Sequence, residues 1–148
     1  MFELIQIARF DGTRAEARAH VGADWPPIAD HFVGAPVLPG SVQIELCAQI
    51  AGPLAERAVL ARGAERWAFL GMVRNALFQR PVGLPATLIL RAELKRIEPS
   101  AVTVAVEAEV EGEQVCRAEL VMMMIDAEPG WADAIADARA RVARWERA

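Results

Sequence analysis

The sequence predicts an α+β fold in which an antiparallel sheet curls around one long helix, with a further helix at the end of the chain. Three observations lead to this class. The segment 40–61 has helical length and is apolar on nearly all sides in its first half, which is typical of a buried helix. Four strand-like segments then follow in series, which indicates an antiparallel sheet around the helix. The segment 131–148 repeats apolar residues at helical spacing.

The N-terminal part is expected to supply the first strands of the sheet. Residues 1–8 are apolar but few, and the sequence leaves open whether they form a strand or a turn of helix. The Phe-Asp-Gly of 10–12 predicts a turn. Residues 13–21 alternate in the manner of a strand, and the Trp-Pro-Pro within 22–30 indicates an irregular loop.

The segment 40–61 is the clearest helix. Pro39 and Gly40 stand at its start, and Ser41 is expected as the N-cap, because a serine hydroxyl can accept a hydrogen bond from a first-turn amide. Pro53 is expected to kink or break the helix, since proline has no amide hydrogen to donate. Gly63 is the expected stop.

The second half of the chain is predicted to form four strands and a helix. The strands are expected at 67–78, 86–97, 101–110 and 114–125, with a tight hairpin at Glu111-Gly112-Glu113. In the final helix, one face is apolar, so we expect that helix to pack on the body or on another subunit. The residues of that face are Trp131, Ile135, Ala138, Val142 and Trp145.

Composition limits the class of protein. The chain has 148 residues, of which 54% are hydrophobic, so we expect one domain over 1–148, with a core of about 1–126. Its net charge of −4 argues against a nucleic-acid binder. We expect a cytosolic protein, because no secretory signal and no membrane-spanning run is evident. Cys47 and Cys116 are interpreted as buried thiols, and the absence of clustered Cys and His argues against a metal site.

The stretch that points to chemistry is DHFVGAPVLPGSVQIE, residues 30–45. A histidine, two prolines and two glycines precede a mostly apolar helix that contains one isolated carboxylate, Glu45. Ser41, Glu45 and Gln49 are spaced four residues apart and so share one face of that helix. A single polar face on an apolar helix indicates that this face lines a site.

This stretch resembles the 3-hydroxyacyl-acyl carrier protein dehydratases of the FabA/FabZ kind. The resemblance rests on His31-Phe32-x-Gly34-x-Pro36-x-x-Pro39-Gly40, followed by Glu45 and Ala48-Gln49. Further matches are Phe69-Leu70-Gly71-Met72 and Phe78-x-Arg80-Pro81-Val82, so the similarity covers about 13–125. It implies a hotdog fold, with 131–148 as an addition. Two departures are Leu84-Pro85-Ala86, where the family usually has Pro-Gly-Asp, and an opening that lacks the usual Pro-His-Arg.

Dehydration of a 3-hydroxyacyl thioester needs a base for the C2 proton, an acid for the leaving hydroxyl and a donor to the thioester carbonyl. His31 suits the base, since histidine titrates near neutral pH. Glu45 suits the acid, and the backbone amide of Gly40 at the helix start suits the oxyanion donor. The resemblance implies that the carbonyl of Val37 accepts a hydrogen bond from the His31 ring. The expected substrate contacts are Gly34, Gln49, Phe69, Leu70 and Met72.

The resemblance also implies partners. The acyl group would arrive on the 4'-phosphopantetheine of acyl carrier protein or on CoA, with no metal or redox cofactor. The protein would be a homodimer or higher oligomer in which His31 and Glu45 of one site come from different subunits. One or two of Arg74, Arg80 and Arg91 could meet the acidic carrier, although such arginines are most often solvated.

Two other functions stay open on the sequence alone. A hotdog thioesterase also places an acid on the central helix, but it usually lacks this histidine loop with two prolines. A non-catalytic dehydratase-like subunit would have lost the histidine or the acid, and both His31 and Glu45 are present. The acyl chain, the pathway and an additional isomerase activity are not specified by the sequence; glutamate rather than aspartate at 45 leans against isomerisation.

Overall fold

The computed structural model describes residues 3–28 and 34–148. The described part folds into one sheet and two α-helices, with short 3-10 turns at Pro26–Ile28 and Pro129–Trp131. In chain order the elements are β1 (Ile5–Phe10), β2 (Arg14–Val21), α1 (Gly40–Leu60), β3 (Trp67–Phe78), β4 (Ala86–Ile97), β5 (Ala101–Val110), β6 (Glu113–Ile125) and α2 (Ala132–Arg147).

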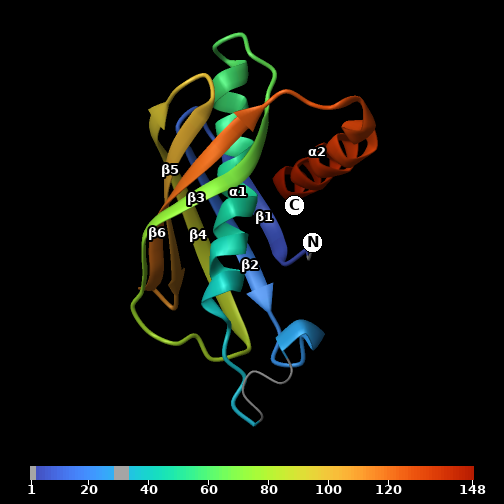
Figure 1. Ribbon diagram of the computed structural model, residues 1–148. Helices are drawn as coiled ribbons and strands as arrows, with labels where there is room; N and C mark the ends of the chain where they lie inside the picture. The colour runs from blue at the N-terminus through green and yellow to red at the C-terminus, as the bar shows by residue number, and fades with distance from the viewer. Residues whose placement is uncertain (1–2, 29–33) are drawn as a thin grey trace.

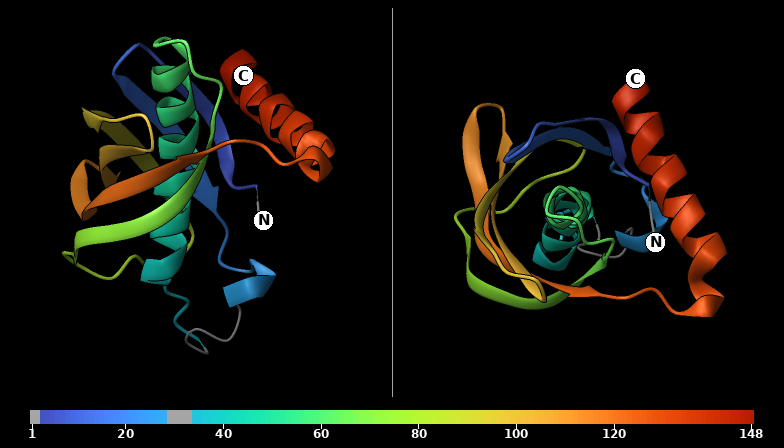
Figure 2. Two further views of the ribbon diagram at one scale, coloured as in Figure 1. Left: turned by 45° about the horizontal axis from the view of Figure 1, so that its top comes forward. Right: turned by 90° about the horizontal axis from the view of Figure 1, so that it is seen from above.

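The sheet curls around α1, which runs through its concave side (Figures 1 and 2). Its strand order is β1-β2-β4-β5-β6-β3, and every neighbouring pair is antiparallel. The predicted α+β class and the hotdog arrangement are therefore confirmed. The order leaves β1 and β3 as the two edges of the sheet.

The core forms where inward-facing strand residues meet α1. Alternate residues of β4 and β5 are buried, as their sequence pattern predicted; these include Leu88, Leu90, Ala92, Val102, Val104 and Val106. From α1, Leu46, Ile50 and Leu54 are fully buried. Cys47 and Cys116 are also buried and free, as expected. Burial raises the pKa of Cys116 to about 11 and that of Cys47 further, so both thiols stay protonated near neutral pH.

Helix α1 differs from its prediction at two points. Its N-cap is Pro39, whose carbonyl accepts from the amides of Val42 at 3.1 Å and Gln43 at 3.2 Å. The expected N-cap, Ser41, instead lies exposed in the first turn, because the helix begins one residue before it. The expected break at Pro53 does not occur: one helix continues to Leu60, and Leu54, Ala55 and Val59 of its second half are buried in the core.

The strand predictions hold closely. Strands β3, β4 and β5 have the predicted bounds, and β6 begins one residue earlier, at Glu113. Glu111 and Gly112 have φ of 51° and 80°, so a two-residue turn with left-handed backbone joins β5 to β6. Residues 5–10 form a strand, which settles the alternative left open for the N-terminus.

Helix α2 packs against β1, on the body of the same chain (Figure 2, right). Trp145 inserts into the core and is only 4% exposed. The Arg9 guanidinium donates to the carbonyls of Trp145 and Ala148 at 3.3 and 3.0 Å, which satisfies acceptors that a helix end leaves open. Arg57 of α1 forms an ion pair with Glu146. The β1 edge is thus covered, whereas among the described residues no strand pairs with the outer side of β3.

Throughout 3–28 and 34–148, neither helix is apolar enough over a sufficient length to cross a membrane.

Candidate active site

The start of α1 is the centre of the candidate site. Pro39 provides no side-chain cap, and within the described ranges the amides of Gly40 and Ser41 have no acceptor. Such open amides, at the positive end of the helix dipole, attract a developing negative charge. The ring of Phe78 lies against Gly40: a Cβ there would be 2.9 Å from ring carbons Cε1 and Cζ. Residue 40 must therefore be glycine unless that ring moves.

The loop that leads into α1 is tied to the segment after β3. The Leu38 amide donates to the Val82 carbonyl at 2.8 Å, and the Leu84 amide donates to the Pro36 carbonyl at 3.1 Å. Between these bonds, Val37 forms an antiparallel bridge with Gly83. We call this pairing of 36–38 with 82–84 the loop clamp. It fixes the backbone around Val37, whose carbonyl the family resemblance implied as the acceptor for the His31 ring.

The loop clamp includes the place where the chain departs from the family pattern. Leu84 occupies the position of the first residue of the usual Pro-Gly-Asp, and the Leu84–Pro85 peptide is cis. A proline at 84 could not donate the hydrogen bond that the Leu84 amide makes to Pro36. At position 84 the departure therefore permits a backbone hydrogen bond that proline could not make, while Ala86 stands where the family usually has the carboxylate of aspartate.

Glu45 and Gln49 meet on one face of α1, as their spacing predicted. The Gln49 amide nitrogen Nε2 donates to Glu45 Oε1 at 3.2 Å. Gln49 is 6% exposed and Glu45 is half-buried, so the carboxylate is held by a buried partner while one side stays accessible. This geometry suits a side chain that must deliver a proton to a ligand.

Two of the predicted residues precede α1 in the sequence. His31 lies outside the described residues. Gly34 is exposed, with a φ of 77° that favours glycine.

The three residues predicted to wall an acyl tunnel lie on β3, on different faces of the sheet. Leu70 is opposite the buried Met122, so it faces α1. Phe69 is opposite Met123 and Met72 is opposite Val121, after a bulge, so both point away from α1. Phe69 and Met72 are 48% and 50% exposed.

The sequence interpretation missed two residues. Phe78 was noticed only as part of a family match, and its contact with Gly40 joins residues far apart in the chain. Glu56 lies eleven positions after Glu45, near the far end of the same helix. Burial raises the pKa of Glu56 to about 7, while the Ala68 backbone amide, Arg139 and Arg57 lower it by less. The clue in the sequence was a second acid on a largely apolar helix.

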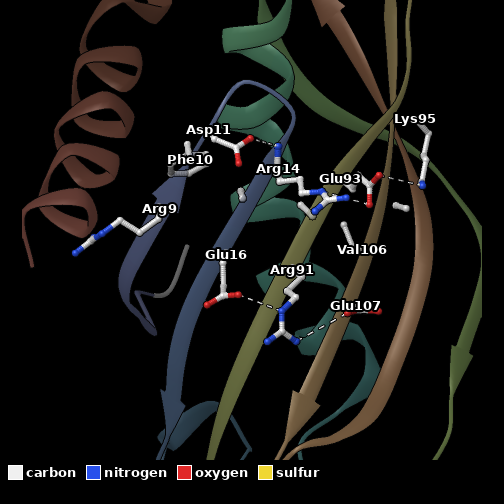
Figure 3. A pocket seen from close by; sticks show the side chains of 13 residues that line it. Arg9, Phe10, Asp11, Arg14, Glu16, Arg91, Glu93, Lys95, Val106 and Glu107 are labelled. Atoms are coloured by element: carbon white, nitrogen blue, oxygen red, sulfur yellow. Dashed lines mark hydrogen bonds and ion pairs between the residues drawn. The ribbon is translucent and has the colours of Figure 1, made fainter.

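A shallow hollow of about 670 Å³ lies on the face of the sheet turned away from α1 (Figure 3). Its charged side chains pair with one another: Glu93 contacts Arg14 at 3.8 Å and Lys95 at 3.5 Å, and Arg91 contacts Glu16 at 3.1 Å. This hollow is a charged surface rather than a site for an acyl chain.

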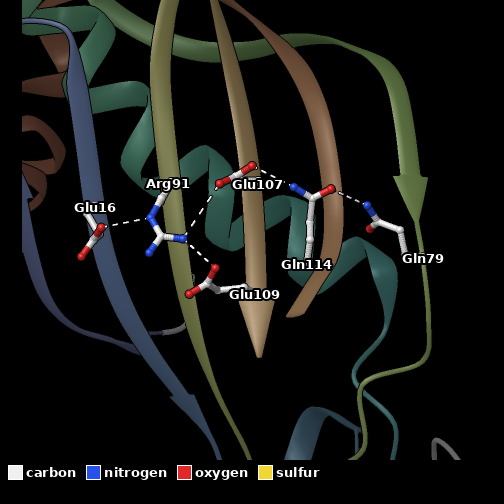
Figure 4. A network of polar contacts seen from close by, with 6 residues as sticks. All are labelled: Glu16, Gln79, Arg91, Glu107, Glu109 and Gln114. Carbon is white, nitrogen blue, oxygen red and sulfur yellow. Dashed lines mark hydrogen bonds and ion pairs between the residues drawn. The ribbon is translucent and has the colours of Figure 1, made fainter. Parts of the chain in front are cut away.

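The same face has a row of alternating charges across the strands, and Figure 4 shows its middle part, in which Arg91 lies between Glu16 and Glu107. Arg9, Glu16, Arg91, Glu107 and Arg117 lie opposite one another in that order on β1, β2, β4, β5 and β6. Opposite charges on facing strands stabilise this register, because a shift by one residue would move them to the other face. Within the described ranges, no group of His, Cys, Asp and Glu could hold a metal ion.

Comparison with known proteins identifies the family. The model of the FabA-like domain matches residues 1–119, which include the loop clamp, Gly40 and Glu45. The chain belongs to the FabA-like domain family. A curated relative, the 3-hydroxyacyl-[acyl-carrier-protein] dehydratase FabZ of Thermus thermophilus, is 37% identical over 120 residues, which cover 80% of this chain and 83% of the relative.

Solved structures support the fold of this FabA-like chain. A Streptococcus mutans protein bound to acetyl-CoA matches with a TM-score of 0.69 and 15% identity, covering 86% of this chain and 94% of the other. A thioesterase from Haemophilus influenzae matches with a TM-score of 0.64 and 20% identity, covering 82% and 78%. At such identities the likeness shows the fold alone. The residues around α1 therefore decide between reactions.

Proposed function

We propose that this FabA-like protein dehydrates a 3-hydroxyacyl thioester to the trans-2-enoyl thioester, with the acyl group presented by acyl carrier protein. The observation that supports this most directly is the start of α1. There, the open amides of Gly40 and Ser41 precede the Glu45–Gln49 pair on the same helix, in a chain with FabZ dehydratases as relatives. A dehydratase needs these two groups, a carbonyl-polarising donor and a proton donor, at one place.

The steps balance as two proton transfers with the substrate and one that restores the protein. The His31 imidazole takes the C2 proton while the thioester oxygen accepts from the Gly40 amide. Electrons from the C2–H bond form the C2–C3 double bond, and the C3 hydroxyl leaves as water with a proton from Glu45. His31 then returns its proton to the Glu45 carboxylate through water. In this scheme the Val37 carbonyl accepts from the other ring nitrogen of His31, and the chemistry requires no metal or redox group.

We further propose that two copies pair through β3. The free edge of β3 belongs to a strand of twelve residues with exposed apolar side chains on both faces, including Met72, Val73 and Leu77. Exposed edges of this kind are open to pairing with another chain. In an antiparallel β3–β3 contact, the same strand of each subunit pairs around a two-fold axis, as a closed dimer requires. This contact would bring the segment that precedes α1 in one subunit toward α1 of the other.

For the acidic carrier protein, Arg74 is the best placed of the three arginines considered. Arg80 pairs with Glu113 at 2.8 Å, and Arg91 pairs with Glu16 and Glu109. Arg74 lies exposed on β3 and contacts the sulfur of Met72 at 3.2 Å. Its charge is therefore the most available to a carrier protein that docks near the edge of the sheet.

The test is an assay of purified protein with a 3-hydroxyacyl thioester on acyl carrier protein, in which enoyl product and free thiol are both measured. We expect enoyl formation that falls by about 100-fold or more in His31→Ala and Glu45→Gln. The control is His20→Ala, on the outer face of β2, which should keep full activity. Free thiol without enoyl would identify a thioesterase instead, and neither product would indicate a non-catalytic subunit.

A further inference from the structure

Phe78 occupies a position that neither the proton transfers nor the oxyanion contact explains. It is the last residue of β3 and lies opposite Cys116, a buried residue of the sheet face toward α1. Phe78 therefore points toward α1, where its ring lies against Gly40. Its side chain is nevertheless 42% exposed, so one side of the ring remains open beside the start of the helix.

The contact between Phe78 and Gly40 is held from both sides. Directly after Phe78, the Gln79 amide donates to the Val115 carbonyl at 2.9 Å, which ties this end of β3 to β6. Before Gly40, the loop clamp joins Leu38 to Val82 at 2.8 Å. The two backbones are therefore held in place, so the ring can leave Gly40 only by rotation of the Phe78 side chain.

This inference rests on the proposed dehydration at Gly40. A thioester whose carbonyl accepts from the Gly40 amide places its C2 carbon next to that carbonyl, close to the Gly40 α-carbon. The side of that α-carbon where a Cβ would stand is already filled by the Phe78 ring. In this conformation the ring thus forms a wall beside C2, with little room for a substituent on that carbon.

We propose that Phe78 is a specificity-determining residue that selects 3-hydroxyacyl thioesters without a branch at C2. An aromatic wall at this place disfavours a methyl group at C2, because the Phe78 ring must rotate away from Gly40 before a branch can fit. Discrimination of one methyl group in an apolar site is worth about 10-fold to 200-fold in kcat/KM.

The experiment compares 3-hydroxybutyryl and 2-methyl-3-hydroxybutyryl thioesters on acyl carrier protein. The wild-type protein should prefer the unbranched substrate by about 10-fold or more in kcat/KM. In Phe78→Ala this ratio should fall toward one, because kcat/KM for the branched substrate rises. Phe78→Leu should give a ratio between those of the wild type and Phe78→Ala. Phe78→Trp retains a large ring and should keep the preference, which covers the case that the alanine variant does not fold.

Leu77→Ala is the matched control, because Leu77 is the neighbouring residue, is 44% exposed and points to the other face of the sheet. It should leave the substrate ratio unchanged. Equal losses on both substrates in Phe78→Ala and Phe78→Leu would overturn the proposal and make the ring a structural support only. A wild-type ratio near one would also overturn it. Absence of enoyl product from both substrates in the wild type would instead refute the proposed dehydration itself.

Discussion

At the scale of single residues, the site depends on the open amides at the start of α1 and on the side chains that pack beside them. Gly40 was expected to be the oxyanion donor, and the structure adds a requirement for glycine there, since Phe78 fills the space of a side chain. Glu45 has a buried partner in Gln49. Cys47 and Cys116 are buried with raised pKa values, so the nucleophilic thiol of a covalent mechanism is not provided there.

Glu56 predicts a pH dependence of stability. Its folded-state pKa of about 7 exceeds the ordinary 4.5, so the native state binds more protons than the unfolded state between these values. The free energy of unfolding should therefore fall as pH rises through this window, by about 1–3 kcal/mol. Glu56→Gln should remove most of this fall, so the variant gains stability over wild type at pH 8 but not at pH 4.

Urea titrations at several pH values measure this dependence. Glu128→Gln is the control, because it removes the same charge from an exposed loop position and should leave the shape of the profile unchanged. A Glu56→Gln profile parallel to that of the wild type would show that another group causes the pH dependence.

At the scale of elements, the loop clamp connects two segments that are distant in the sequence. Residues 36–38 precede α1, and 82–84 precede β4, yet their backbones are hydrogen-bonded to one another. The clamp sets where the carbonyl of Val37 and the start of α1 lie. The departure at Leu84 belongs to this clamp, so it concerns the position of the catalytic loop.

Leu84→Pro should loosen the clamp, because proline cannot donate to the Pro36 carbonyl. Loss of one backbone hydrogen bond of about 1 kcal/mol corresponds to about a fivefold change in the population of the clamped loop. We expect kcat to fall by about that factor and hydrogen exchange at the Leu38 amide to accelerate. Leu84→Ala, which keeps the amide, should retain both properties; equal losses in the two variants would assign the effect to the leucine side chain.

At the scale of the whole molecule, the two edges of the sheet differ in what packs against them. Helix α2 covers β1, with Trp145 in the core and Arg9 bound to the carbonyls at the end of the helix. The opposite edge, β3, has a long strand with exposed apolar residues. An assembly built at β3 would leave α2 at its outer ends, so the added helix does not interfere with a shared site.

A shared site predicts complementation between inactive variants. A heterodimer of His31→Ala and Glu45→Gln subunits contains one site with both native residues and one with neither, if each site draws on two subunits. Purified through two different tags, it should show about half of the wild-type activity per dimer. A doubly tagged His31→Ala homodimer is the control and should stay inactive; an inactive heterodimer would mean that each site is built within one subunit.

The sequence determined the elements and the reaction chemistry to a large extent. Alternation over 86–97 and 101–110 predicted β4 and β5 with their bounds, because half-buried strands repeat every two residues. The apolar character of α1 predicted a helix enclosed by a sheet, and the spacing of Glu45 and Gln49 predicted their contact. Local patterns of this kind are visible in sequence since they depend on neighbours a few residues away.

Only the tertiary structure decided what depends on distant neighbours. The N-cap is Pro39 rather than Ser41 because the clamped loop fixes the residue at which α1 begins. The helix continues past Pro53 because packing against the sheet stabilises its second half. The contact of Phe78 with Gly40 and the raised pKa of Glu56 arise between elements that the sheet brings together. Packing and desolvation act through space, so no local pattern in the sequence could specify them.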